Sequence, residues 1–274
     1  MLPAQSPAPS VTGIRRALGE SGLEIVQALP APDREVPAAR WEIEVLVHYD
    51  DSEGTPIDYR VWLEPTATDE ETHVSWDDDD LRQKVRNSRY CLGVSAYFEG
   101  KREIDYQRQL ELLSIVAPKQ IALVDRSACC GRSRQWTLDV LESSQTPHLF
   151  EVHTVNEDSG SAVWLHTHGL LRFGIPELEV MDTEQERSRQ MKTLLTQVAE
   201  WFLRCGTPPM DDAFDACPEI QTLVWLPWQV AIDQLPRTVR HAFERDVFHR
   251  APAAMLFVPQ KRIFGWRRYL IPGV

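Results

Sequence analysis

The chain has 274 residues, 43% of them hydrophobic, and a net charge of −12. This composition supports a packed core and excludes a mostly disordered chain. Because no run approaches the roughly 18 apolar residues of a membrane span, we expect no membrane partner, and the acidic balance argues against a nucleic-acid partner. The first residues, "MLPAQSPAPSVTG", lack the basic start and apolar core of a signal peptide, which predicts a cytoplasmic location.

The five cysteines also favour a cytoplasmic location. Their number is odd and no two are spaced as C-x-x-C, so the sequence supports neither a zinc ribbon nor a redox motif. The adjacent residues Cys129 and Cys130 are poorly placed to bridge each other. We therefore expect reduced, mostly buried thiols.

Residues 1–38 are rich in Pro, Ala and Ser, which predicts a flexible tail with at most a short helix around Ile14 to Leu18. Apolar residues then alternate in "RWEIEVLVHY", and this pattern predicts a strand. The acidic turn "DDSEG" and the run "IDYRVWLEP" complete a predicted hairpin.

Helices and strands alternate in the next part of the chain. We predict helices at 77–88, 102–117 and 136–144, and strands at "YCLGVSAYF", "QIALVD" and "LFEVHTV". This order implies right-handed crossovers and a partly parallel sheet. In such a sheet "VDRSACCGRS" would follow the carboxyl end of a strand, where Asp125, Ser127 and Cys129 could line a cleft.

A second hairpin and a long helix follow. "LFEVHTV" and "AVWLHTH" flank the turn-forming loop "NEDSGS". The apolar pattern predicts a helix over 184–205, beginning at a capping box of Thr183 and Glu186. Strands "IQTLVWL" and "AAMLFVP" enclose a predicted helix near 237–247.

These elements predict one main α+β domain over 39–274, with a mixed β-sheet and flanking helices. Within it, 211–274 could form a C-terminal subdomain with a basic tail. From residue 236 to the end there are eight Lys or Arg and only two Asp or Glu. A protein partner could dock on this segment, with Arg267 and Arg268 as contacts, or the segment could lie against an acidic face of its own chain.

The second hairpin carries two histidines one residue apart. Successive side chains of a strand point to opposite faces, so His166 and His168 share a face with Trp164, and His153 shares one with Glu151. Whether the two faces coincide depends on the register. If Glu151 lies opposite His166 and His153 opposite Trp164, the three histidines gather on one face; a slip by one residue separates them.

Imidazole and carboxylate groups bind zinc and other divalent metal ions. The candidate ligands are His153, His166, His168 and Glu179. The spacing of the last three resembles that of JAMM-type metallo-isopeptidases, which implies a metal-dependent hydrolase. The sequence departs from their motif, because Gly169 replaces a proline, Pro176 a serine and Glu179 an aspartate. Hydrogen-bonded histidines on a packed polar face are the alternative, and apart from such a metal ion we expect no cofactor.

In "PELEV", Glu177 and Glu179 alternate with Leu178 and Val180. This pattern predicts an edge strand whose carboxylates face water. Gly169 precedes this strand and is expected to permit a tight turn.

The segment "VWLHTHGLLRFGIPELEVMD", with "IALVD" before it and the long helix after it, resembles an uncharacterised bacterial family in which W-L-H-T-H-G-L is followed by E-L-E. The resemblance covers about residues 40 to 230 and implies an α+β cytosolic domain of unknown function. It carries over no catalytic residue. It directs attention to one ligand or partner site: Trp164, His166, His168, Gly169, Glu177 and Glu179.

Two hypotheses about function follow. The leading one is a non-catalytic binding or interaction module with its site around the histidine hairpin. The alternative is a metal-dependent hydrolase that uses His166, His168 and either His153 or Glu179.

Overall fold

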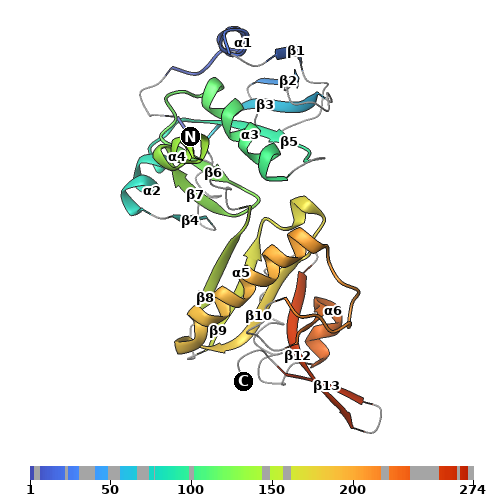
Figure 1. Ribbon diagram of the computed structural model, residues 1–274. Coiled ribbons are helices and arrows are strands. Elements are labelled where there is room, and N and C mark those ends of the chain that lie inside the picture. Colours follow the sequence, from blue (N-terminus) through green and yellow to red (C-terminus); the bar gives the residue numbers. More distant parts are fainter. Residues whose placement is uncertain are drawn as a thin grey trace. The chain divides into compact units, whose positions relative to one another are not determined.

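The computed structural model describes residues 1–2, 7–21, 24–30, 41–48, 56–66, 74–76, 78–98, 102–143, 149–156, 162–216, 222–234, 253–263 and 266–270 (Figure 1). The chain divides into two compact units, Met1–His148 and Leu149–Val274. The predicted α+β class with a mixed sheet is confirmed. The sequence did not mark the division at residue 148.

The larger sheet of the first unit is antiparallel, in the order β1-β2-β3-β5. Its strands are β1 (Glu24–Pro30), β2 (Trp41–His48), β3 (Ile57–Pro65) and β5 (Tyr90–Ala96). In β2, Ile43, Val45 and Val47 are buried and alternate with half-buried residues, which confirms the predicted hairpin with β3. Helix α3 (Arg102–Val116) packs on β5, and helix α1 (Val11–Gly19) packs on α3.

Part of the predicted N-terminal tail is folded. The Ser10 side chain caps α1 by accepting a hydrogen bond from the backbone N–H of Gly13, and the helix buries Ile14 and Leu18. Strand β1 pairs with β2. The short helix predicted around Ile14 to Leu18 is confirmed, β1 is a further element of this segment, and the flexible tail itself stays a prediction. Two apolar side chains on one helix face and a strand partner outweigh the effect of the Pro and Ala content.

The smaller sheet of the first unit has the order β4-β7-β6. Its strands are β4 (Ser75–Trp76), β6 (Ala122–Asp125) and β7 (Cys130–Ser133), and helices α2 (Asp79–Arg86) and α4 (Arg134–Glu142) flank it. The predicted crossovers between β5, β6 and β8 are wrong, because these strands belong to three different sheets. Strand β6 pairs with the strand that directly follows it and stands at the end of its sheet, so this pairing is local in the chain.

Asp125 closes the turn between β6 and β7. Its Oδ1 accepts from the backbone N–H groups of Ser127 and Ala128, both at 3.0 Å, and its Oδ2 accepts from the Tyr106 hydroxyl at 2.8 Å. β6 and β7 are antiparallel, so the parallel strand end on which the predicted cleft depended is not present at β6. The Asp125 carboxylate holds a hairpin turn instead.

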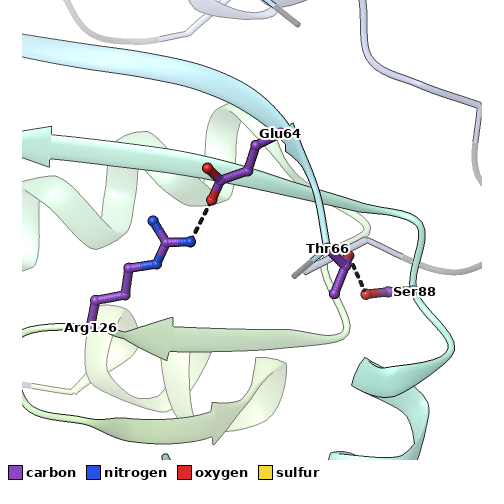
Figure 2. Close-up of polar contacts among 4 residues, drawn as sticks. All are labelled: Glu64, Thr66, Ser88 and Arg126. Carbon is purple, nitrogen blue, oxygen red and sulfur yellow. Dashed lines mark hydrogen bonds and ion pairs between the residues drawn. The ribbon is translucent and has the colours of Figure 1, made fainter. Parts of the chain in front are cut away.

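Figure 2 shows one ion pair that joins the two sheets of the first unit and one hydroxyl contact between the end of β3 and the start of β5. Arg126, in the β6–β7 turn, donates from Nη2 to Oε1 of Glu64 on β3 at 2.5 Å. The Thr66 and Ser88 hydroxyl oxygens lie 3.0 Å apart. The Glu64 residue is only 8% exposed, so the guanidinium compensates a carboxylate that would otherwise be costly to bury.

The second unit contains a mixed sheet in the order β11-β12-β10-β9-β8, with β13 paired to β12. Strands β10 and β12 are parallel, and the other neighbours are antiparallel. The strands are β8 (Glu151–Asn156), β9 (Ala162–His168), β10 (Glu177–Glu184), β11 (Val224–Pro227), β12 (Ala253–Ile263) and β13 (Trp266–Leu270).

Helix α5 (Ser188–Cys205) packs along β8, β9 and β10 (Figure 1). Its buried residues include the predicted stripe of Met191, Leu194, Leu195, Val198 and Phe202. The predicted capping box is wrong, because β10 continues to Glu184 and Thr183 is buried within it. The 3-10 turn η3 (Gln185–Arg187) then leads into the helix.

Another apolar cluster fills the face of this sheet that carries Trp164. It combines Trp164 of β9 with Met255 and Phe257 of β12 and with Ala231 of the short helix α6 (Trp228–Ala231), which is followed by the 3-10 turn η4 (Ile232–Gln234). The predicted helix at 237–247 lies outside the described residues, as do the side chains of Arg267 and Arg268.

Candidate functional site

The register of β8 and β9 brings the three histidines to one face. His153 pairs with His166 and Glu151 with His168. Of the two registers that the sequence left open, the structure therefore has the one in which the two faces coincide. The pairing is two residues away from the one considered in the sequence, and a shift by two preserves the face of every side chain.

A row of side chains crosses three neighbouring strands. Glu179 of β10 pairs with His166 of β9, and His166 pairs with His153 of β8. Glu179 is fully buried (0% exposed) and His166 is 4% exposed, whereas His153 and His168 are half-buried. The row thus runs from a buried carboxyl group toward partly accessible imidazoles.

The three imidazole rings form what we call the histidine cluster: His153, His166 and His168. The Nε2 atoms of His166 and His168 lie 3.1 Å apart. The His153 ring is stacked on the His166 ring, with centroids 5.7 Å apart and planes at 5°, and it meets the His168 ring edge-on at 4.8 Å. The Trp164 ring borders the cluster, 4.5 Å from the ring of His166.

The electrostatics of Glu179 are those of a group in an apolar interior. Burial raises the pKa of its carboxyl group to about 8, the charge of Glu177 acts in the same direction, and a hydrogen bond from the Trp164 side chain opposes the rise. Near neutral pH a large fraction of this group is therefore protonated. Carboxyl groups with such shifts are concentrated at functional sites, although buried structural networks also produce them.

The carboxylate of Glu177, unlike that of Glu179, is held by the loop that follows β9. Its Oε2 accepts a hydrogen bond from the Thr167 hydroxyl at 2.7 Å, and its Oε1 accepts from the backbone N–H groups of Gly169 at 2.9 Å and Leu171 at 3.2 Å. The Thr167 hydroxyl oxygen in turn accepts from the backbone N–H of Leu178 at 2.8 Å. Burial raises the pKa of Glu177, and these hydrogen bonds oppose the rise. Glu177 therefore fixes the loop between β9 and β10.

Gly169 allows the chain to leave β9 at this point. Its φ is +114°, and an added Cβ would lie 2.8 Å from the carbonyl oxygen of Leu149 and 3.1 Å from Cα of Phe150. Arg172, in the 3-10 turn η2 (Leu171–Phe173), donates to the carbonyl oxygen of Leu149. Gly169 therefore belongs to the framework of the loop rather than to a binding surface.

The structure thus divides the residues singled out in the sequence. Trp164, His166, His168 and Glu179 gather around the histidine cluster, together with His153, while Gly169 and Glu177 hold the adjoining loop. The prediction that Glu177 and Glu179 face water on an edge strand is wrong: they are 2% and 0% exposed, because β10 lies between β9 and β12. Sequence reasoning also missed Thr167, whose small polar side chain between two histidines was the available signal.

The cluster does not form a complete set of metal ligands. Within the described ranges, no group of three or more His, Cys, Asp or Glu side chains is arranged to hold a metal ion. The Nε2 atoms of His166 and His168 converge, and the third imidazole stacks beside them.

Comparison with known families accounts for both units of the chain. A family model described as protein of unknown function (DUF4026) N-terminal matches residues 20–147, and one described as DUF4026 C-terminal matches residues 152–257. The chain belongs to the DUF4026 family. The predicted membership of an uncharacterised family is confirmed, while the W-L-H-T-H-G-L motif itself stays a prediction.

The two DUF4026 matches meet where the structure divides, between residues 147 and 152. The histidine cluster lies in the C-terminal DUF4026 region. No match was found among curated proteins or among solved structures. In the part of the chain that the structure describes, every helix is too short or too polar to span a membrane.

Proposed function

We propose that this DUF4026 chain is a non-catalytic binding module and that the histidine cluster is its ligand site. One observation carries the proposal: three imidazoles from two strands gather on a sheet face directly beside a fully buried carboxyl group. The same face is filled by apolar side chains around Trp164, Met255 and Phe257. Burying polar side chains on a sheet face that apolar side chains could fill costs free energy. We therefore attribute the imidazoles and the Glu179 carboxyl group on this face to recognition of a ligand.

The exposure of the rings supports binding. His153 and His168 are half-buried, so a ligand can reach them, while His166 and Glu179 beside them are buried. We keep the cytoplasm of a bacterium as the proposed location, since an odd number of cysteines without a C-x-x-C pair suits a reducing compartment.

Hydrolysis is the weaker proposal. A metal-dependent hydrolase needs a carboxylate base that can reach a bound water. Both oxygens of Glu177 accept hydrogen bonds from Thr167 and the loop backbone, and Glu179 is 0% exposed. These contacts favour binding without turnover.

Two measurements test the proposal without knowledge of the ligand. The first is modification of the native protein with diethyl pyrocarbonate, mapped by mass spectrometry: we expect His153 and His168 to react well before His166. If neither half-buried ring reacts in the folded protein, no ligand can reach the cluster and the proposal fails.

The second measurement is thermal stability. Residues kept for binding cost stability, so the double variant His153→Val/His168→Val should melt about 3–6 °C above the parent protein. His48→Val, at the half-buried end of β2, is the control for the higher strand propensity of valine. A lower melting temperature in the double variant would mean that the histidines hold the fold together and are not a ligand site.

A further inference from the structure

We propose that the ligand of the histidine cluster is a divalent transition-metal ion, bound by Nε2 of His166 and Nε2 of His168 and completed by the His153 imidazole. This inference rests on the proposed function and names the ligand class of the same site.

The distance between the two converging nitrogens fits a shared metal ion. Metal–imidazole bonds are about 2.0–2.1 Å long, so two nitrogens on one ion are separated by roughly 2.9 Å at a right angle and roughly 3.4 Å at the tetrahedral angle. The observed separation of the Nε2 atoms is 3.1 Å. A hydrogen bond between two neutral rings fits the same distance, and the experiment below separates the two cases.

The third ligand requires the His153 side chain to change its conformation, because the three rings as described are not arranged around a metal ion. The His153 ring is already 4.8 Å from the His168 ring and 5.7 Å from the His166 ring, measured between centroids. Its strand, β8, lies at the end of the sheet order, and its side chain is half-buried. On this proposal, metal binding turns the His153 imidazole about its side-chain torsions, away from its stacked contact with His166 and toward the two Nε2 atoms.

The donor set determines the class of ion. Imidazole nitrogen suits zinc, copper, nickel and iron, whereas magnesium and calcium prefer oxygen ligands. Glu179, the register partner of His166, borders the site as a carboxyl group, the kind of neighbour that commonly orients a metal-bound histidine.

The test uses the full, untagged chain, because a histidine tag would itself bind metal. Zinc and cobalt(II) are the probes. We expect about one equivalent of metal with a dissociation constant of about 10 μM or tighter, cobalt absorption bands in the visible range, and Nε2 resonances of His166 and His168 shifted to metal-bound positions in a histidine-labelled sample.

Half-buried positions supply the variants, so that folding is retained. His168→Ala and His153→Ala should each weaken zinc binding at least about tenfold, whereas His48→Ala, on β2 of the other unit, should leave it unchanged. Circular dichroism of each variant checks the fold.

Three results would overturn the inference: no zinc bound at about 100 μM, unchanged affinity in either single variant, or Nε2 resonances of His166 and His168 that do not respond to zinc. If zinc does not bind but the modification and stability tests give the expected outcomes, the cluster remains a binding site for another ligand. If those tests also fail, the proposed function falls with the metal.

Discussion

Glu179 lies directly across from His166 in the register of β10 and β9. A fully buried acid and a nearly buried base are therefore neighbours in the middle of a sheet. Most strand pairs at such a position are apolar, because unpaired polar groups are costly there. The predictions below concern the pH dependence of stability, the loop between β9 and β10, and the packing of a glycine in the first unit.

The stability of the second unit should fall as the pH rises from about 4.5 to about 8. The pKa of Glu179 is raised from 4.5 to about 8 in the folded chain. Between these values the folded group retains a proton that the unfolded group has released, so the unfolded state becomes relatively more favourable as the pH rises. Urea unfolding of the metal-free protein across this range measures the effect.

Glu179→Gln isolates this contribution, since an amide of the same shape does not ionise. At the alkaline end of the range the variant should exceed the parent protein in free energy of unfolding by roughly 2–5 kcal/mol, and the difference should shrink toward acid pH. Glu184→Gln, whose side chain is 66% exposed, should keep the parental pH dependence. Parallel curves for Glu179→Gln and the parent protein would contradict the prediction.

Removal of the Glu177 carboxylate should loosen the loop between β9 and β10. Glu177→Ala leaves the Thr167 hydroxyl and two backbone N–H groups without their acceptor, and we expect a loss of about 2–4 kcal/mol. Chemical denaturation measures this loss. Thr167→Val should destabilise less, and the double variant should cost less than the two single changes together, since they break one network. Strict additivity would show that the two side chains act independently.

Gly169→Ala should destabilise the same region by about 1–3 kcal/mol. The backbone at this position has a φ of +114°, and the new methyl group would meet the Leu149 carbonyl oxygen at 2.8 Å. Hydrogen exchange of the loop amides locates the effect. Gly174→Ala provides the comparison, because its φ is also positive (+71°) but no atom lies within 4 Å of an added Cβ. Equal effects at both positions would rule out the steric part of the explanation.

In the first unit, Gly93→Ala should cost about 1–3 kcal/mol through overpacking. Gly93 pairs with Trp62 across β5 and β3, and an added Cβ would lie 2.1 Å from Cε2 of the Trp62 ring. Thermal unfolding and the near-ultraviolet signal of the tryptophan report the change. Gly19→Ala, at the end of α1 with open space around it, should be close to neutral. Unchanged stability in Gly93→Ala would mean that the indole moves aside at little cost.

Local patterns in the sequence were sufficient for many elements. Alternation predicted β2 and β3, the apolar stripe predicted α5, and period-two geometry placed His166 and His168 on one face. These predictions succeed because they depend on residues a few positions apart, whose relative directions follow from the backbone geometry of a strand or helix.

Such local patterns did not predict which strands, far apart in the chain, pair with each other. The alternation of helices and strands suggested parallel crossovers, but β5, β6 and β8 lie in separate sheets. A strand pattern states which face is apolar and does not state which strand lies beside it. The same limit explains why Glu177 and Glu179 were assigned to an edge: their burial depends on β12, whose described part starts at residue 253.

The sequence by itself determined the α+β class, the negative net charge and the presence of three histidines that two strands could present together. Only the tertiary structure decided that His153 faces His166, that Glu179 completes the row, and that Glu177 turns aside to hold a loop. The reason is physical: side-chain direction is a local property of the backbone, whereas register, strand order and burial are set by the packing of segments far apart in the chain.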